Sequence, residues 1–169
     1  MMVKCQKDFD FSEWYEIARP ILEHPEFQKR KTFAHHGSIS VYEHVIMVSM
    51  QAYKMAKKRN LNYRDATIAG LLHDFYTTPW MEDTIKKPIL KRHAFIHAEV
   101  ALNNAKEYFS ELLNPTIENT ILRHMFPLNI RPPKYLVGWI VTLADKIVSI
   151  ECFHEPKFIK GTIKGAIGR

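Results

Sequence analysis

Residues 68–74 read Ile-Ala-Gly-Leu-Leu-His-Asp, so two polar side chains, His73 and Asp74, close a run of apolar and small residues. Apolar residues upstream of this pair recur at steps of three and four, which is the period of an α-helix. Asn62 is suited to cap such a helix, and the pattern predicts a helix from about Asn62 to Phe75. Burying a carboxylate without a partner costs several kcal/mol. An inward Asp74 therefore needs a cation, a metal or a set of hydrogen-bond donors.

The helical period extends over most of the chain, whereas the alternation typical of strands is nearly absent. Ser40 and Glu43 form the pattern of a capping box, which predicts a helix start at Ser40. Asn114 and Pro115 combine a capping residue with the residue preferred at the first helical position. Helices are predicted over about Ser12–Glu23, Ser40–Lys58, Asn62–Phe75 and Ala94–Phe109, from Asn114 onward, and over about Tyr135–Cys152.

Two segments depart from this period. Residues 80–92 are predicted to form a basic loop, and the glycine-containing stretch from Pro156 to Arg169 is predicted to be a poor helix. The fold class expected is all-α, a single domain formed by a bundle of five to seven helices over residues 1–169. Its core is expected at about residues 40–146, with a helix and loop over 1–39 and a basic tail over 153–169.

The composition is typical of a soluble globular domain. The chain has 169 residues, of which 46% are hydrophobic and 25% charged. Because no apolar stretch is long enough to cross a bilayer, no membrane partner is expected. The first residues lack the apolar core of a secretory signal, and Cys5 and Cys152 make no disulfide framework. A cytoplasmic location is therefore expected, and the net charge of +6 favours an anionic partner.

Several polar residues lie within the apolar stripes of different predicted helices. They are His44, His73, Asp74, His97, His124 and Asp145. A lone inward histidine is usually structural, but four of them together with two aspartates call for a chemical explanation. Imidazole nitrogen and carboxylate oxygen together suit Zn, Fe, Mn, Co or Ni. Helix bundles often build metal sites from inward side chains on several helices.

Three segments carry a resemblance to a known family. They are Ser-Val-Tyr-Glu-His44-Val-Ile-Met-Val-Ser, Ala-Gly-Leu-Leu-His73-Asp74 and Val-Thr-Leu-Ala-Asp145-Lys146. In this order the chain resembles the HD-domain superfamily of metal-dependent phosphohydrolases, and among these the small single-domain bacterial members. The resemblance implies an HD-domain-like helical bundle in which His44, His73, Asp74 and Asp145 hold a divalent transition metal.

The same family has a version with two metals, which uses two more histidines between the His-Asp pair and the last aspartate. His97 and His124 match these positions best, and Asp74 would then bridge the two metals. His93 precedes His97 by four residues and can share its helix face, so either one is a candidate ligand. The resemblance therefore implies one or two metal ions per chain.

The activity that the resemblance implies is hydrolysis of a nucleotide or another small phosphoester. A metal-activated water would attack phosphorus, and Asp74 is the candidate catalytic residue that would help to orient it. Positive or hydrogen-bonding side chains near the centre would bind the phosphorylated substrate. The candidates for this role are His36, Lys91, Arg92, His93 and Lys146.

Two other functions stay open at this point. One is a non-catalytic HD fold that binds a nucleotide or regulates a partner protein. The other is a nucleic-acid-binding module, which the +6 charge and the basic tail favour. Against it, the basic clusters are scattered along the sequence and no known nucleic-acid motif is present.

Overall fold

The structure of the protein, a computed structural model, describes residues 11–33, 39–76, 93–154 and 156–167. These residues form eight α-helices and no strand, which confirms the all-α class. The helices are α1 (Ser12–Leu22), α2 (Pro25–Gln28), α3 (Val41–Lys58), α4 (Tyr63–Leu72), α5 (His93–Tyr108), α6 (Pro115–Arg123), α7 (Leu136–His154) and α8 (Pro156–Ile167). Two short 3-10 helices, η1 (Lys29–Thr32) and η4 (Ser110–Leu112), join them.

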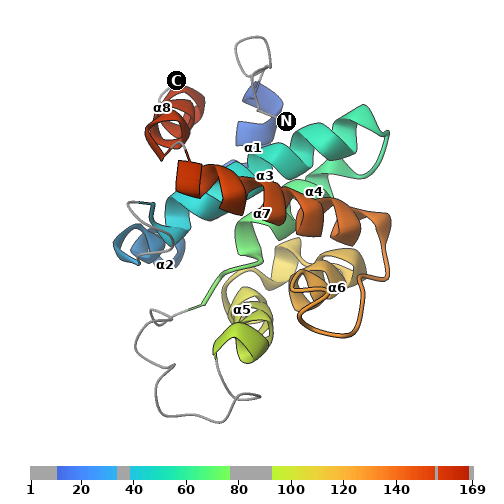
Figure 1. The fold of residues 1–169 in the computed structure, drawn as a ribbon. Helices are drawn as coiled ribbons and strands as arrows, with labels where there is room; N and C mark the ends of the chain where they lie inside the picture. The colour runs from blue at the N-terminus through green and yellow to red at the C-terminus, as the bar shows by residue number, and fades with distance from the viewer. Residues whose placement is uncertain (1–10, 34–38, 77–92, 155, 168–169) are drawn as a thin grey trace.

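Helices α3 and α4 pack closely against each other at the centre of the bundle, and α7 crosses in front of them (Figure 1). The two helices approach closely at Gly70 of α4, where an added Cβ atom would lie 2.7 Å from the Cα atom of Ser49 on α3. The Ser49 hydroxyl donates to the Thr67 carbonyl at 2.9 Å and accepts from the Trp14 indole at 3.0 Å. This buried hydrogen-bond chain ties α1, α3 and α4 together.

The predicted caps define where three of the helices begin. Ser40 and Glu43 form the capping box, with the Ser40 amide donating to Glu43 at 2.8 Å and the Glu43 amide donating to Ser40 at 3.2 Å. The side chain of Asn62 accepts from the Asp65 amide at 3.0 Å, and that of Asn114 accepts from the Thr116 amide at 2.9 Å. Each cap satisfies an amide that lacks a partner within its own helix.

Two helices were not expected. Pro25 begins the single turn of α2, and the tail predicted to be a poor helix forms α8. Burial of Ile163 against the core outweighs the low helix propensity of Gly161 and Gly165. An added Cβ atom at either glycine would meet open space. The predicted loop over residues 80–92 lies outside the described residues.

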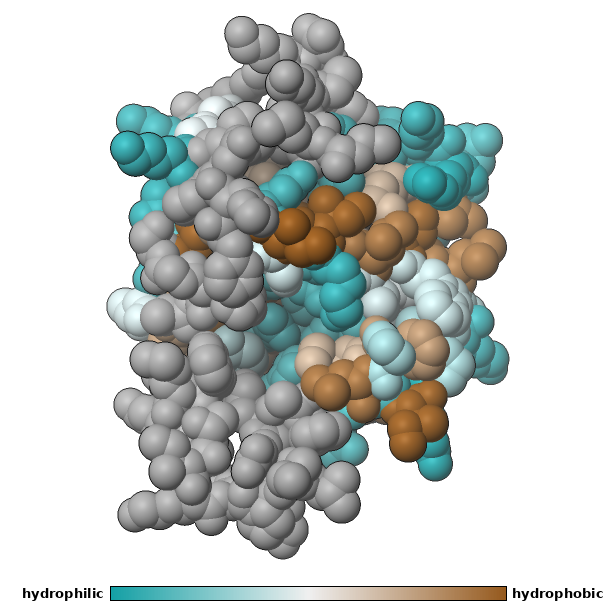
Figure 2. Space-filling view, in the orientation of Figure 1, coloured by the Kyte–Doolittle hydropathy of each residue, from teal (hydrophilic) through white to brown (hydrophobic). Residues whose placement is uncertain are grey.

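Helix α7 keeps an apolar face in contact with solvent. Figure 2 shows apolar residues gathered in a band over this helix. The exposed apolar residues of α7 are Leu136, Trp139, Leu143 and Ile150. Trp139 also contacts the ring of Phe126, in the loop that follows α6, with a centroid distance of 5.3 Å.

None of the described helices is long and apolar enough to cross a membrane.

Candidate metal centre

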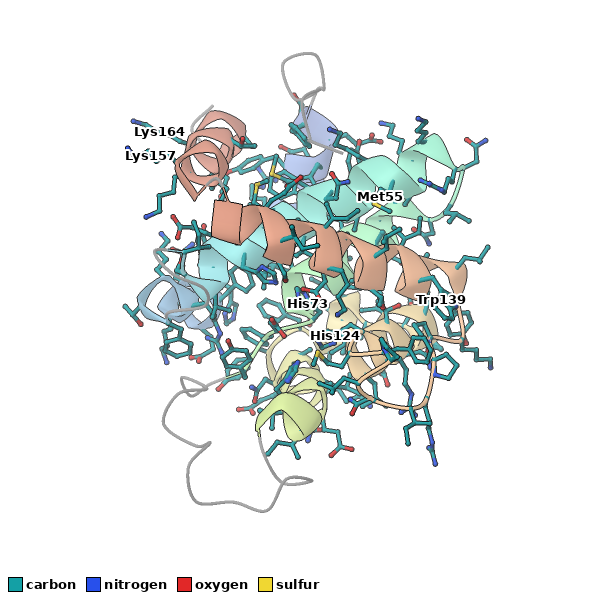
Figure 3. The ribbon with its side chains drawn as sticks, in the orientation of Figure 1. Met55, His73, His124, Trp139, Lys157 and Lys164 are labelled. Atoms are coloured by element: carbon teal, nitrogen blue, oxygen red, sulfur yellow. The ribbon has the colours of Figure 1, made fainter. Side chains whose placement is uncertain are left out.

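Five helices bring the predicted imidazoles and carboxylates to one buried place. His44 lies in the first turn of α3, His97 on α5 and Asp145 on α7, while His73, Asp74 and His124 follow the last residues of α4 and α6. All six residues are at most 7% exposed. Figure 3 shows His73 and His124 beside each other below α7, and their ring centroids are 4.9 Å apart. The structure thus places together the whole set predicted from the sequence.

One group of donors surrounds His73. The Nε2 atom of His44 lies 3.2 Å from Oδ1 of Asp145 and 4.0 Å from Oδ2 of Asp74. The Nε2 atom of His73 lies 3.8 Å from the same Asp145 oxygen and 3.5 Å from the same Asp74 oxygen. Two imidazole nitrogens and two carboxylate oxygens therefore face a common point.

A second group of donors lies on the other side of Asp74. Its Oδ1 atom is 3.4 Å from Nε2 of His97 and 3.5 Å from Nε2 of His124. The two histidine Nε2 atoms are only 3.0 Å apart. Two ring nitrogens that face each other so closely need a proton or a cation to share. The two Asp74 oxygens thus face different pairs of histidines.

Local helix geometry orients two of the rings. His73 and His124 are the C-cap residues of α4 and α6. The Nδ1 atom of each ring lies within hydrogen-bond distance of the backbone carbonyl three residues earlier in the chain. These contacts are 2.9 Å to Gly70 and 2.7 Å to Ile121. In the neutral tautomer that donates from Nδ1, the lone pair is on Nε2 and points into the cluster. Backbone carbonyls commonly orient metal-binding histidines in this way.

The donor set fits a divalent transition metal. Ligand bonds of about 2.0–2.2 Å place neighbouring donors about 3.0–3.5 Å apart in octahedral or tetrahedral geometry. The separations His44–Asp145, His73–Asp74 and His97–Asp74 lie within this range, whereas His73–Asp145 at 3.8 Å and His44–Asp74 at 4.0 Å are longer. Moreover, the buried Nε2 atom of His73 has no hydrogen-bond partner among the described residues. Two combinations from this cluster, His44 with His73 and Asp145 and His73 with Asp74 and His124, could each hold an ion.

The charges in the cluster depend on one another. Burial alone would raise the pKa of Asp74, but His73, His124 and His97 hold it well below its usual value. Burial likewise opposes ionisation of Asp145, and His44 and His73 keep its pKa low. Burial alone would lower the pKa of His73, whereas the carboxylates of Asp74 and Asp145 raise it to about 9. In the metal-free protein His73 therefore carries a proton that a metal must displace.

The metal-free protein is expected to lose stability as the pH rises from about 6.5 to about 9. Over this range His73 keeps its proton in the folded protein but loses it in the unfolded chain. Rising pH therefore stabilises the unfolded state relative to the folded state. The loss is at most about 3 kcal/mol. At the acidic end, stability falls as the pH drops below 3.8, the ordinary pKa of Asp74 and Asp145.

Thermal unfolding of chelator-treated protein across this pH range measures the effect. Metal-loaded protein should not lose stability toward pH 9, because loss of the His73 proton favours metal binding. A metal-free melting temperature that is the same at pH 6.5 and pH 9 would contradict the assignment of this charge.

The predicted substrate-binding residues are described only in part. The Nζ atom of Lys146 donates to Oδ2 of Asp145 at 2.9 Å, and the Lys146 side chain is 44% exposed. The lysine therefore lies at the edge of the cluster. His93 begins α5, but its side chain is outside the described part of the chain, so only His97 is seen to reach the cluster. His36, Lys91 and Arg92 also lie outside the described residues.

Two residues that contact the cluster or the chain beside it were not predicted from the sequence. Ser149 donates to Oδ1 of Asp145 at 3.4 Å, and its place one helical turn after that aspartate could have indicated this. Asn104 of α5 donates to the carbonyl of Phe75 at 2.8 Å and so holds the chain just after Asp74. No sequence signal points to Asn104, because the contact depends on how α5 packs.

Fold and site together define an all-α bundle with a buried cluster of imidazoles and carboxylates able to hold metal. The chain matches the HD domain family over residues 41–150, about two-thirds of its length, and it belongs to this family. The family is part of a superfamily of metal-dependent phosphohydrolases. A comparison with curated proteins found no match, and neither did a comparison with solved structures.

Proposed function

We propose that the protein hydrolyses a nucleotide or another small phosphoester at a centre of two divalent transition metals. The observation that carries this proposal is the placement of Asp74. One of its oxygens faces His44 and His73, and the other faces His97 and His124. A carboxylate placed between two sets of imidazoles is suited to bridge two ions.

The chemistry divides between the ions and the side chains. Bound divalent metals lower the pKa of a coordinated water and neutralise phosphoryl oxygens. Asp74 stays ionised because the pKa of its carboxyl group is low, so it accepts hydrogen bonds and orients the attacking water. The backbone carbonyls of Gly70 and Ile121 keep the rings of His73 and His124 in place during the reaction.

The residues proposed to contact the substrate are chosen by their charge and hydrogen-bonding capacity. The ammonium group of Lys146 lies at the edge of the cluster and offsets the charge of an incoming phosphate. His36, Lys91, Arg92 and His93 remain proposed contacts for the same substrate. A small phosphorylated molecule is the partner that this arrangement favours, because the cationic Lys146 side chain lies beside the buried centre.

The test is metal analysis of protein purified without chelators, followed by a screen of phosphomonoesters, nucleotides and cyclic nucleotides. We expect about two metal ions per chain and metal-dependent hydrolysis of at least one class. His97→Ala should reduce the metal content to about one ion, since it removes a ligand from one group only. His24→Ala is the matched control, because His24 packs against Phe109 away from the cluster.

The alternatives give different results. Tight nucleotide binding without turnover would favour a non-catalytic HD fold. Binding of nucleic acid that weakens steeply with salt and survives chelation would favour a nucleic-acid-binding module. Protein that holds no metal and hydrolyses nothing would rule out the proposed activity.

A further inference from the structure

In the part of the chain that the structure describes, three threonines are buried within helices, and one of them differs from the other two. The hydroxyl of Thr67 donates to the Tyr63 carbonyl, and that of Thr120 donates to the Thr116 carbonyl, both at 2.7 Å. Such a bond to the carbonyl four residues earlier is the usual way to satisfy a helical threonine. Thr142 is only 7% exposed, yet its Oγ atom has no hydrogen-bond partner among the described residues.

Helix geometry places Thr142 next to Asp145, the residue that α7 contributes to the cluster. Thr142 precedes Asp145 by three residues and Lys146 by four, and residues at these spacings are neighbours on a helix surface, with Cβ atoms about 5–6 Å apart. One turn earlier, Gly138 faces Thr120 of α6, whose Oγ atom would lie 3.3 Å from an added Cβ atom. Thr142 therefore lies on the face of α7 that carries Gly138 and Asp145, one helical turn from each of them.

A phosphoryl group at this centre needs hydrogen-bond donors, and the cluster itself supplies few. The two aspartates are ionised and can only accept, and the rings of His73 and His124 direct their Nδ1 donors to backbone carbonyls. The Thr142 hydroxyl and the Lys146 ammonium are donors on the adjacent surface of α7. A buried hydroxyl left without a partner is costly unless a ligand satisfies it.

We propose that Thr142 is a substrate-contacting residue, which donates a hydrogen bond from Oγ to a phosphoryl oxygen of the bound phosphoester. The inference rests on the proposed function, because it places the phosphate at the metal centre. It adds a residue that would fix the orientation of the phosphoryl group.

The test compares Thr142→Val, which removes the hydroxyl with little change of shape, with Thr142→Ser, which keeps it. Binding of inorganic phosphate to the metal-loaded protein is measured by calorimetry, together with metal content, the melting temperature of the metal-free protein and kcat/KM. We expect Thr142→Val to weaken phosphate binding about tenfold, with unchanged metal content and an unchanged or higher melting temperature. Thr142→Ser should bind phosphate like the unsubstituted protein.

Thr67→Val and Thr120→Val are matched controls. Each removes a satisfied hydroxyl, so the melting temperature should fall by about 2–4 °C while phosphate binding stays unchanged. The proposal is overturned if Thr142→Val binds phosphate normally, or if it lowers the melting temperature as much as Thr120→Val does.

The two proposals fail in different ways. If no phosphoester is hydrolysed but phosphate binding still depends on the hydroxyl, the anion contact stands and the hydrolase does not. If hydrolysis proceeds with the same kcat/KM and phosphate affinity in Thr142→Val, only the role of Thr142 is lost.

Discussion

Replacing Asp74 by Asn is expected to abolish hydrolysis and to remove at least one metal ion per chain. The carboxylate is the only group in the described cluster with one oxygen toward each pair of histidines. A neutral amide donates where the histidines need an acceptor, and it supplies no negative charge to hold a cation. A loss of several kcal/mol of transition-state stabilisation corresponds to a rate decrease of about 10³-fold or more.

Metal content and the hydrolysis rate measured on the same preparation check this prediction. Asp65→Asn is the matched control, since Asp65 is also a buried aspartate, but it lies on α4 and accepts a hydrogen bond from Asn114 at 3.0 Å, away from the cluster. The Asp65→Asn variant should keep its metal content and its hydrolysis rate per folded molecule. Full metal content and an unchanged rate in Asp74→Asn would exclude Asp74 from the centre.

Replacing Gly70 by Ala is expected to destabilise the protein by about 2–3 kcal/mol. The new Cβ atom would lie 2.7 Å from the Cα atom and 3.1 Å from the backbone nitrogen of Ser49, so α3 and α4 must move apart. The Gly70 carbonyl also orients the His73 ring. The movement should therefore weaken metal binding about tenfold or more, as the loss of a supporting contact does at other metal sites.

Urea unfolding of the metal-free protein and a separate metal titration measure the two effects of Gly70→Ala. Gly161→Ala in α8 provides the opposite case, because its added methyl group meets nothing within 4 Å. That variant should gain about 0.5–1 kcal/mol through higher helix propensity. If Gly70→Ala unfolds at the same urea concentration as the unsubstituted protein, the result contradicts the close approach of α3 and α4 at Gly70.

The sequence was most informative where local rules apply. Ser40, Asn62 and Asn114 cap helices as predicted, because a cap depends only on a few consecutive residues. The cluster residues were recognisable because histidine and aspartate are unusual on an apolar helix face. That their side chains meet depends on how the helices pack, and before the structure only the family resemblance implied this meeting.

What the sequence did not predict depends on tertiary structure. α8 forms because Ile163 finds a place against the core, which overrides the glycines of the segment. The His-Asp pair lies just beyond the end of α4 rather than within a helix that continues to Phe75, so that His73 can cap the helix and face the centre at once. The unsatisfied hydroxyl of Thr142 is visible only when its surroundings are known.

The contact between His44 and Asp145 has a consequence for the order of folding. These residues are 101 positions apart, whereas the helix caps and the contact of His73 with Gly70 span only a few residues. Contacts distant in sequence require the closure of a long loop, and they form late compared with local ones. On a growing polypeptide, α3 and α4 can pair well before α7 exists. The cluster is therefore completed only when the last of its helices docks, so metal binding acts on a nearly finished fold.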